Sequence, residues 1–240
     1  MKVSAFKSFV CPMDGLPLLQ EKNIFRCEKG HVFDMAREGY CNLLLVQQKA
    51  SLDPGDSQTM VAARRKFLEG GYFAPIAARV FEMVCEMTAN VKHDSSLRIV
   101  DAGCGEGYYL HQLSKLVVAN HHQGTLALAG GDISKWAVKA AAKRSPDIAW
   151  AVAGNRQLPF APGTVDLILS MFGFPDWENF RTVQPVDGRV LLIDPGPDHL
   201  IELRRIIYPE VNIRERRSLN TATEYGYRLK STDQIKFSMN

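Results

Sequence analysis

The chain has 240 residues, 46% of them hydrophobic and 23% charged, so it can bury a sizeable core in one large domain or in a small module joined to a domain of ordinary size. Its net charge of +3 is compatible with a nucleic-acid partner but does not indicate one. No run approaches the roughly eighteen consecutive apolar residues of a membrane span, and no apolar segment after Lys2 and Lys7 has the length of a signal peptide, so we expect neither.

The cysteines have no spacing typical of a disulfide framework. Their number is odd, and two of them lie in segments that we expect to be buried. Free cysteines are typical of a reducing compartment, so we expect a cytoplasmic protein. The cysteines are Cys11, Cys27, Cys41, Cys85 and Cys104.

Residues 1–45 are predicted to form short strands joined by tight turns. They contain too little apolar material for a core of their own, so something must hold them together. Within the stretch CPMDGLPLLQEKNIFRCEKGH, Cys11 and Asp14 are three residues apart, and Cys27 and His31 are four apart. This spacing indicates either a zinc site in which a carboxylate replaces one thiolate, or a metal site that has been lost.

Residues 46–95 are predicted to be helical. The turn Asp53–Ser57 offers an N-cap, and the run QTMVAARRKFL follows it until a pair of glycines ends the helix. A second helix begins near Pro75 and has one apolar face. Basic side chains on the first helix are either contacts for nucleic-acid phosphates or an ordinary solvated face. They are Arg64, Arg65 and Lys66.

From residue 97 onward, apolar runs alternate with helical patterns. The runs are continuous, as expected for parallel strands that are covered on both faces. This alternation predicts an α/β fold with a doubly wound sheet over residues 96–240. The predicted strands are 98–102, 126–132, 148–153, 165–171 and 189–194, and the predicted helices are 107–119, 134–144, 176–182 and 197–207.

A glycine-rich loop, DAGCGEG, joins the first of these strands to its helix. Glycines there let the backbone approach a ligand, and the start of the helix supplies free N–H groups. The loop lacks the G-K-[ST] of a P-loop, and Asp101 before the glycines would repel a pyrophosphate. A ligand with an ammonium group, such as S-adenosylmethionine (SAM), fits better, and Asp132 after the second strand is placed to accept from both ribose hydroxyls. The alternative for both acids is helix capping and turn formation.

The third and fourth strands end at the same edge of the sheet, where open α/β sheets bind ligands. Asn155 follows the third strand, in the place where an adenine ring would rest. The fourth strand ends in SMFGFP, and its Phe172 and Phe174 either face the ligand or pack in the core.

Together these motifs resemble the RlmA family, the ribosomal large-subunit methyltransferases A, which are similar to TlrB-type resistance enzymes. The resemblance covers nearly the whole chain. DAGCGEG alone indicates only a class I SAM methyltransferase, whereas FDMAREGYCNLL and DPGDSQTMVAARRKFL narrow the resemblance to this family. The resemblance implies an enzyme that methylates N1 of a guanine in a hairpin loop of 23S rRNA. It also implies a zinc module that helps to hold RNA, a SAM-binding core and a homodimer.

By position, the resemblance also implies a SAM site. The loop residues would contact the cofactor, the acid after the second strand would bind the ribose, and the asparagine after the third would lie beside the adenine. These residues are Asp101, Gly103, Cys104 and Gly105, then Asp132, and then Asn155.

The resemblance implies a structural zinc site with three cysteines and one histidine. Cys11, Cys27 and His31 match this set, and Asp14 stands where the family has its second cysteine. A carboxylate is an allowed ligand but a harder one than a thiolate, so we expect zinc that is weakly held. The alternatives are Cys41 as the fourth ligand, or a site without metal.

Two further departures from the family concern the substrate side. The fourth strand ends in Met171–Pro175, where the family reads close to I-Y-A-P-C, which leaves the base specificity open. The chain ends at QIKFSMN, near the family's sixth strand, so we expect an unpaired strand there and an incomplete C-terminus. The catalytic base is not identified, because Asp176, Asp194 and Asp198 are more typical of helix caps.

The leading prediction is therefore a SAM-dependent rRNA (guanine-N1)-methyltransferase in three parts. Residues 1–45 would be a zinc-binding module for RNA recognition, 46–95 a helical linker, and 96–240 the SAM-binding domain. The alternative is a truncated or non-catalytic relative that binds SAM or RNA without turnover. A small-molecule methyltransferase is disfavoured, because such an enzyme needs no appendage that holds RNA.

Overall fold

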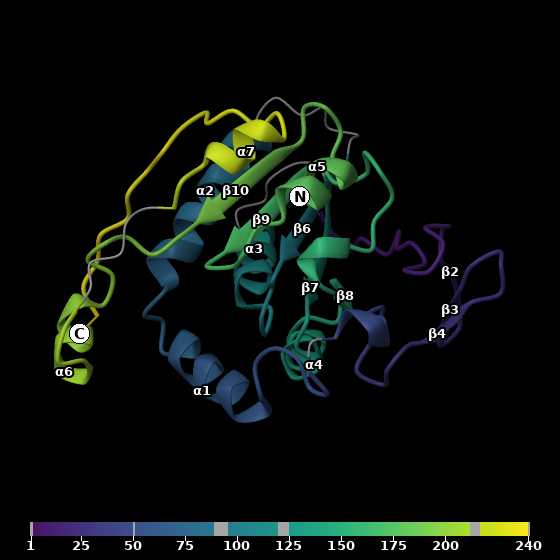
Figure 1. Cartoon of the computed structure of the whole chain (residues 1–240), viewed down its shortest axis with the longest axis horizontal. Helices are drawn as coiled ribbons and strands as arrows, with labels where there is room; N and C mark the ends of the chain where they lie inside the picture. Colours follow the sequence, from purple (N-terminus) through teal and green to yellow (C-terminus); the bar gives the residue numbers. More distant parts are fainter. Residues whose placement is uncertain (1, 50, 89–95, 120–124, 212–216, 240) are drawn as a thin grey trace.

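The computed structural model of the protein describes residues 2–49, 51–88, 96–119, 125–211 and 217–239, and its centre is a seven-stranded parallel sheet (Figure 1). Across the sheet the strands are β10 (Arg189–Ile193), β9 (Leu167–Met171), β6 (Ser96–Ala102), β7 (Thr125–Asp132), β8 (Ala149–Val152) and β5 (Tyr40–Asn42). The seventh strand, β1 (Lys2–Ala5), pairs with the first half of β7, and β8 pairs with the second half. The strand order reverses between β6 and β9, where the carboxyl ends of the strands border a ligand crevice in folds of this kind.

The five strands predicted after residue 97 are confirmed, with ends that differ by at most two residues. Their apolar runs are buried because both faces of the sheet are covered, and β9 is buried at every position. The first 45 residues also contribute to this sheet, through β1 and β5. The predicted doubly wound α/β architecture is therefore present, and its edge strand comes from the N-terminal segment.

Four helices contribute side chains to the core on one face of the sheet: α1 (Gln58–Glu69), α2 (Ala74–Thr88), α3 (Tyr108–Ala119) and α4 (Lys135–Arg144). Ser57 caps α1, because its hydroxyl accepts from the N–H of Met60 at 3.3 Å, and Gly70 ends that helix as predicted. The predicted apolar face of α2 is buried at Ile76, Val80 and Val84. The apolar face that the sequence predicts for α2 is therefore the face that packs in the core.

The opposite face is covered by two short helices, α5 (Trp177–Val183) and α7 (Asn220–Glu224), and by an N-terminal antiparallel ribbon of β2 (Leu19–Glu21), β3 (Ile24–Arg26) and β4 (Val32–Asp34). Phe160 stacks on Phe6 with ring centroids 5.0 Å apart and contacts Phe9 at 5.5 Å. The core that residues 1–45 lack on their own is therefore shared with the sheet. The ribbon extends to one side of the molecule (Figure 1). The chain also forms two 3₁₀ helices, η1 (Val46–Gln48) and η2 (Asn155–Gln157).

The C-terminal part differs from the prediction in two ways. Helix α6 (Ile201–Ile207) begins four residues later than predicted, after Leu200, whose φ of 53° is left-handed. The strand predicted near the end is wrong, because residues 229–239 form no strand. An ion pair of 2.7 Å between Asp233 and Arg79 holds this segment on α2, and Phe237 packs on Phe73 instead of pairing at the sheet edge.

Residues 89–95 of the predicted helical linker lie outside the described residues. In the part of the chain that the structure describes, no helix has both the length and the apolar character to cross a membrane.

Candidate functional site

The glycine loop after β6 is fastened to the end of β7. The N–H groups of Gly103 and Cys104 donate to the carbonyl of Gly131 at 2.8 and 3.0 Å. The N–H of Gly105 donates to the carboxylate of Asp132 at 2.9 Å. The Cys104 side chain is buried, so only its backbone remains for a ligand. These hydrogen bonds hold the loop in place.

The glycines of this loop have two different roles. A Cβ at Gly107 would lie 2.7 Å from the ring of Trp150, so Gly107 is needed for packing. A Cβ at Gly103 would meet only the amide nitrogen of Asn155, at 3.8 Å, and a Cβ at Gly105 would meet nothing within 4 Å. The φ angles of Gly103 and Gly105 are 86° and 54°, which favours glycine at both positions. Open space beside these two residues is what a ligand that approaches the backbone requires.

Asp101, near the end of β6, is a buried acid without a partner. It is 0% exposed, and neither carboxylate oxygen has a hydrogen-bond partner among the described residues. Burial, and then the charge of Asp132, raises the pKa of Asp101 to about 8. The hydroxyl of Tyr109, in the first turn of α3, is likewise buried and unpartnered within the described ranges. Unpartnered buried groups of this kind indicate a place for a polar ligand, and a cation would favour the ionised form of Asp101.

The carboxylate of Asp132 holds two turns at the end of β7. One oxygen accepts from Gly105 at 2.9 Å, and the other accepts from the N–H of Ser134 at 2.8 Å. Turn formation, the alternative considered for this acid, is therefore present. Each carboxylate oxygen keeps a second acceptor position, so Asp132 can also accept from the hydroxyls of a ribose. Burial raises the pKa of Asp132, and the two N–H donors lower it.

The turn of residues 53–57 packs on the segment that follows β7. The hydroxyl of Ser134 donates to the carbonyl of Asp56 at 2.6 Å. The indole N–H of Trp136 donates to the carboxylate of Asp53 at 2.7 Å. This turn, which was predicted to offer an N-cap for the helix, therefore also lies over the turn that Asp132 holds.

Asn155, the first residue of η2, links the glycine loop to the end of β9. Its side-chain N–H donates to the carbonyl of Phe174 at 2.9 Å, and the same nitrogen lies beside Gly103. The two phenylalanines after β9 have different environments. Phe172 packs against the core, whereas Phe174 is 85% exposed. Core packing is therefore the correct interpretation for Phe172 and the wrong one for Phe174.

The three acids considered as a catalytic base have different partners. Asp176 caps α5, because it accepts from the N–H three residues further on at 3.0 Å, as predicted. The helix-cap prediction is wrong for Asp194, which forms an ion pair of 3.0 Å with Arg217. It is also wrong for Asp198, because α6 begins only after Leu200 and has no side-chain cap. These contacts leave the base unassigned.

The predicted phosphate contacts Arg64 and Arg65 are both paired with acids. Arg64 pairs with Asp56, and Arg65 pairs with Glu69 at 2.8 Å. Glu69 also pairs with Arg144 at 3.1 Å, and Arg144 reaches the buried glutamate of the DAGCGEG loop at 2.5 Å. The arginines remain partly exposed, so a phosphate would have to compete with these acids for them.

Two turns bring the four predicted metal ligands together. In the first turn, the N–H of Gly15 donates to the carbonyl of Cys11 at 2.8 Å, and in the second, the N–H of Gly30 donates to the carbonyl of Cys27 at 2.9 Å. The backbone N–H of Leu16 donates to Asp14 at 3.0 Å. This hydrogen bond contributes most to lowering the pKa of Asp14 to about 2, so the carboxylate is ionised at neutral pH, as a metal ligand must be.

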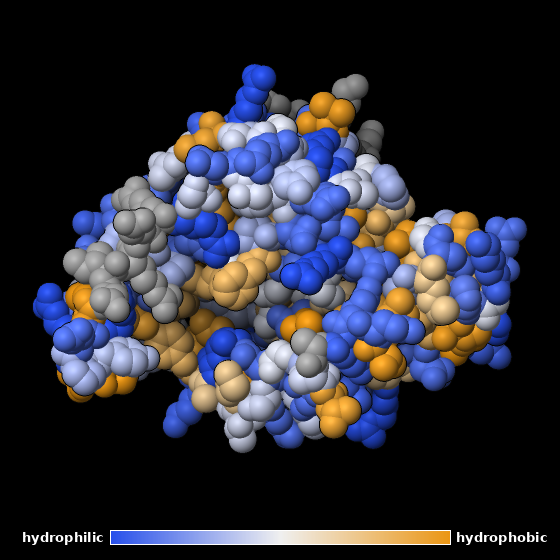
Figure 2. Space-filling model, viewed as in Figure 1, coloured by the Kyte–Doolittle hydropathy of each residue, from blue (hydrophilic) through white to orange (hydrophobic). Residues whose placement is uncertain are grey.

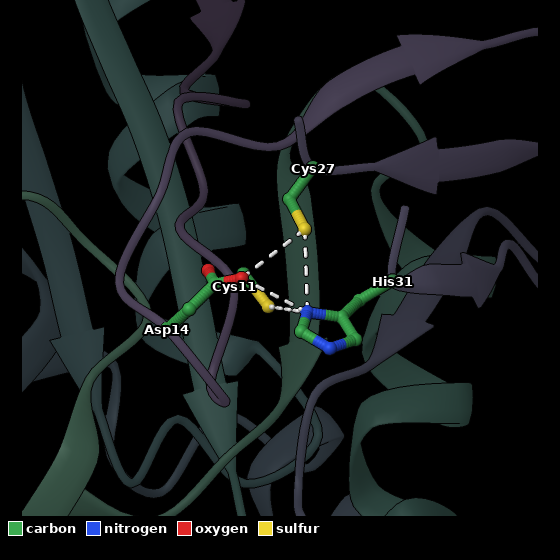
Figure 3. Close-up of side chains that lie close together, drawn as sticks. All are labelled: Cys11, Asp14, Cys27 and His31. Carbon is green, nitrogen blue, oxygen red and sulfur yellow. Dashed lines mark hydrogen bonds and ion pairs between the residues drawn. The ribbon is translucent and has the colours of Figure 1, made fainter. Parts of the chain in front are cut away.

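The donor atoms of these four residues converge (Figure 3). The His31 Nδ1 atom lies 3.5 Å from the Cys11 sulfur, 3.4 Å from the Cys27 sulfur and 2.9 Å from Asp14 Oδ2. Cys27 donates to Asp14 at 3.4 Å. Tetrahedral zinc with ligands at about 2.0–2.3 Å needs separations of about 3.3–3.8 Å, so a small expansion of the His31–Asp14 contact would admit the ion.

Cys41 is not part of this group. It is buried in β5, opposite Ala151 of β8, and burial raises the pKa of its thiol to about 12. The alternative that it supplies the fourth ligand is therefore not supported, because its side chain belongs to the core beneath the sheet.

Sequence reasoning missed the ion pair of Arg217 with Asp194 and the hydrogen bond of Trp136 with Asp53. The partners are far apart along the chain, by 83 residues in the second case, so no local pattern could reveal them. The need of Glu106 for a cationic partner could have been predicted, because a charged residue inside a buried glycine loop requires a partner of opposite charge. That partner is Arg144.

Two family models match the chain. Residues 9–52 match the model described as RlmA, N-terminal, and residues 99–186 match the model described as a methyltransferase domain. A relative of Streptomyces fradiae, a 23S rRNA (guanine(748)-N(1))-methyltransferase, is 33% identical over 204 residues, which are 85% of this chain and 69% of that protein. YxjB of Bacillus subtilis (strain 168), provisionally named a 23S rRNA (guanine-N(1)-)-methyltransferase, is 31% identical over 208 residues, or 85% of this chain and 70% of YxjB. A relative of Micromonospora griseorubida with the same provisional name is 33% identical over 80% of this chain and 67% of its own length.

Proposed function

This chain belongs to the RlmA family of 23S rRNA (guanine-N1)-methyltransferases, and from that premise we propose that it transfers the methyl group of SAM to N1 of a guanine in a hairpin loop of 23S rRNA. Within the structure, one observation carries the proposal. The carboxylate of Asp101 is buried and unpartnered among the described residues, beside the open space at Gly103 and Gly105, at the point where the strand order reverses.

The residues of the crevice fit SAM, which when bound supplies an electrophilic methyl group on a sulfonium. We propose that the ammonium group of the cofactor binds Asp101, because a neighbouring cation offsets the free-energy cost of burying this carboxylate. We assign the ribose hydroxyls to Asp132, whose carboxylate keeps free acceptor positions for them. The edge of the adenine would lie beside Asn155. The loop backbone would line the rest of the site, at Gly103, Cys104 and Gly105.

The protein must also position the guanine and remove its N1 proton. Positioning places the attacking nitrogen in line with the methyl group, which replaces a bimolecular encounter by a fixed geometry. The end of β9 lies beside the glycine loop, so we expect the base to enter there. The proton acceptor is not assigned to any residue.

The metal cluster, which here means the four converging side chains of Cys11, Asp14, Cys27 and His31, has a structural role in this proposal. It lies in the N-terminal turns, and the crevice chemistry requires no metal at that place. We propose Cys11, Asp14, Cys27 and His31 as the zinc ligands, with Asp14 as the weakest of the four. Zinc held there would fix the two turns and orient the ribbon toward RNA.

The same proposal divides the chain into an RNA-recognition module at 1–45, a helical linker at 46–95 and a SAM-binding domain at 96–240. It includes a homodimer, which the family resemblance implies, and a cytoplasmic location, which the free cysteines favour. Arg64 and Arg65 remain proposed phosphate contacts. Reversing both charges should reduce the salt dependence of RNA binding without affecting SAM affinity.

The deciding experiment is methyl transfer from labelled SAM into unmodified 23S rRNA, followed by nucleoside mass spectrometry. The expected product is N1-methylguanosine. SAM binding measured by calorimetry, with no transfer to the RNA, would instead support the non-catalytic alternative. Methylation at a different position of the base would support methyltransferase activity but would overturn the proposed specificity for N1.

A further inference from the structure

An exposed aromatic side chain stands at the rim of the crevice. Phe174 follows the end of β9 and is 85% exposed, although β9 itself is buried throughout. The molecule is hollowed on this face, near the end of β9, with hydrophobic and charged side chains at the rim (Figure 2). A single exposed phenylalanine is ordinary on a protein surface. Phe174 differs in that hydrogen bonds hold the backbone around it and that it lies beside the glycine loop.

The backbone around Phe174 is fixed from both sides. The side-chain N–H of Asn155 donates to the carbonyl of Phe174 at 2.9 Å, and Arg217 donates to the carbonyl of Gly173 at 2.9 Å. Phe172 just before them has a left-handed φ of 57°, which is strained for a residue with a side chain. This bend leaves Phe172 against the core and Phe174 in solvent. A backbone held in this way loses little freedom when the residue binds a partner.

Arg217 supports the Phe174 ring. Its guanidinium carbon lies 5.8 Å from the ring centroid, within the range of a cation–π contact. An ion pair of 3.0 Å with Asp194 holds the guanidinium in that position. Arg217 thus joins the ends of β9 and β10 and occupies one side of the ring, while most of the ring stays exposed.

The ring borders the cofactor crevice. Asn155, which binds the carbonyl of Phe174, lies beside Gly103 of the glycine loop. A Cβ at Gly173 would lie 3.6 Å from the carbonyl oxygen of Ala102, the last residue of β6, so the end of β9 touches the start of the loop. A planar group on Phe174 would therefore lie next to the position where methyl transfer is proposed.

We propose that Phe174, supported by Arg217, is a stacking platform for one unpaired base of the RNA substrate, adjacent to the guanine that is methylated. This inference rests on the proposed function, since it takes RNA to be the substrate. Proteins read RNA loops chiefly by stacking splayed bases on aromatic and guanidinium planes.

The test uses the full chain with three variants and unmodified 23S rRNA as the probe. Phe174→Leu keeps an apolar side chain but removes the aromatic face, and Phe174→Trp keeps that face. Val186→Ala is an exposed apolar control that precedes the amino end of β10, whereas Phe174 follows the carboxyl end of the parallel strand β9. Phe174→Leu should raise KM for the RNA by about 5- to 100-fold, as expected for the loss of one stacked base, with a smaller change in kcat and none in SAM affinity. Phe174→Trp should retain a KM within about threefold of the wild type.

A second readout comes from Phe174→Trp. RNA should quench its tryptophan fluorescence more strongly than that of the wild type, because a stacked base contacts the indole. A KM for Phe174→Leu that equals those of the wild type and Val186→Ala, without extra quenching in Phe174→Trp, would overturn the platform. If the wild type methylates 23S rRNA in that case, the proposed function survives. If the wild type neither binds nor methylates 23S rRNA, both proposals fail.

Discussion

The metal cluster and the cofactor crevice both present polar groups in buried positions, but they satisfy them in opposite ways. In the cluster, four donor atoms from two turns already contact one another at 2.9 to 3.5 Å. In the crevice, the carboxylate of Asp101 has no partner among the described residues, although it is completely buried.

The difference follows from what holds each region together. The crevice stands on a seven-stranded sheet whose loop is fastened by backbone hydrogen bonds, so the fold can tolerate one unsatisfied acid. The turns of the cluster have little core of their own, and Cys11 and Cys27 are themselves buried within the shared core. We therefore expect removal of metal to affect folding, and removal of the crevice acid to affect binding.

The largest effect should come from Cys27→Ser. This change removes a thiolate ligand, so bound zinc should fall to near zero and the free energy of unfolding should decrease by about 3–5 kcal/mol, or roughly 10 °C in melting temperature. Metal analysis and thermal unfolding measure the two quantities. Cys85→Ser, on α2 and outside the cluster, is the matched control. Full zinc occupancy in Cys27→Ser would contradict the ligand assignment.

Asp101→Asn should have the opposite profile. The neutral amide cannot form an ion pair with an ammonium, so SAM affinity should fall by roughly 10- to 100-fold, the range for a hydrogen bond between charged groups. The melting temperature of the cofactor-free chain should not fall, because the wild-type acid is buried and has no hydrogen-bond partner among the residues that the structure describes. Calorimetric titration and thermal unfolding test both statements. A large loss of stability with unchanged SAM affinity would show that Asp101 is a structural acid.

Asp101→Asn should also change how SAM affinity depends on pH. With a pKa of about 8, Asp101 is mostly protonated below pH 8 in the free protein, so binding of a cation must release that proton. SAM affinity should thus weaken by up to about tenfold per unit as the pH falls below 8, and Asp101→Asn should lack this slope. The folded state also retains a proton that the unfolded chain loses above about pH 4, so this group makes the wild type less stable as the pH rises from 4 to 8. Equal slopes in both proteins would assign the pH dependence to another group.

Gly55→Ala should weaken SAM binding more moderately. Gly55 has a φ of 82°, and a Cβ there would lie 2.8 Å from the Cβ of Ser134, so the turn 53–57 would have to lift from the end of β7. That displacement should disturb Asp132 and reduce SAM affinity by about tenfold, the equivalent of roughly 1.4 kcal/mol. Gly39→Ala, which also has a positive φ but no neighbouring atoms within 4 Å, controls for backbone strain alone. Equal SAM affinities in the two variants would exclude the contact as the cause.

The comparison also shows what a sequence can reveal. Sites whose residues lie close together in the chain, such as DAGCGEG and the Cys11–His31 stretch, were predicted because local spacing expresses their chemistry. The two phenylalanines after β9 were not distinguished, because a left-handed φ at Phe172 decides which ring is exposed. The predicted strand at the end of the chain was wrong because Asp233 pairs with Arg79, 154 residues away, on α2. Contacts over such separations depend on the finished fold.

The smallest and most discriminating change is Asp14→Cys, which introduces the cysteine that the family resemblance implies at this position. The thiolate should slow the loss of zinc to a chelator by about tenfold or more, because it is a softer ligand than a carboxylate. The same change removes the hydrogen bond from Leu16 to the Asp14 carboxylate, which should cost the metal-free protein about 1 kcal/mol. The two effects have opposite signs, so Asp14→Cys should be the more stable protein with zinc and the less stable one without it. If zinc loss is no slower in Asp14→Cys, Asp14 is not a ligand, and the convergence of the four side chains reflects hydrogen bonding around His31 alone.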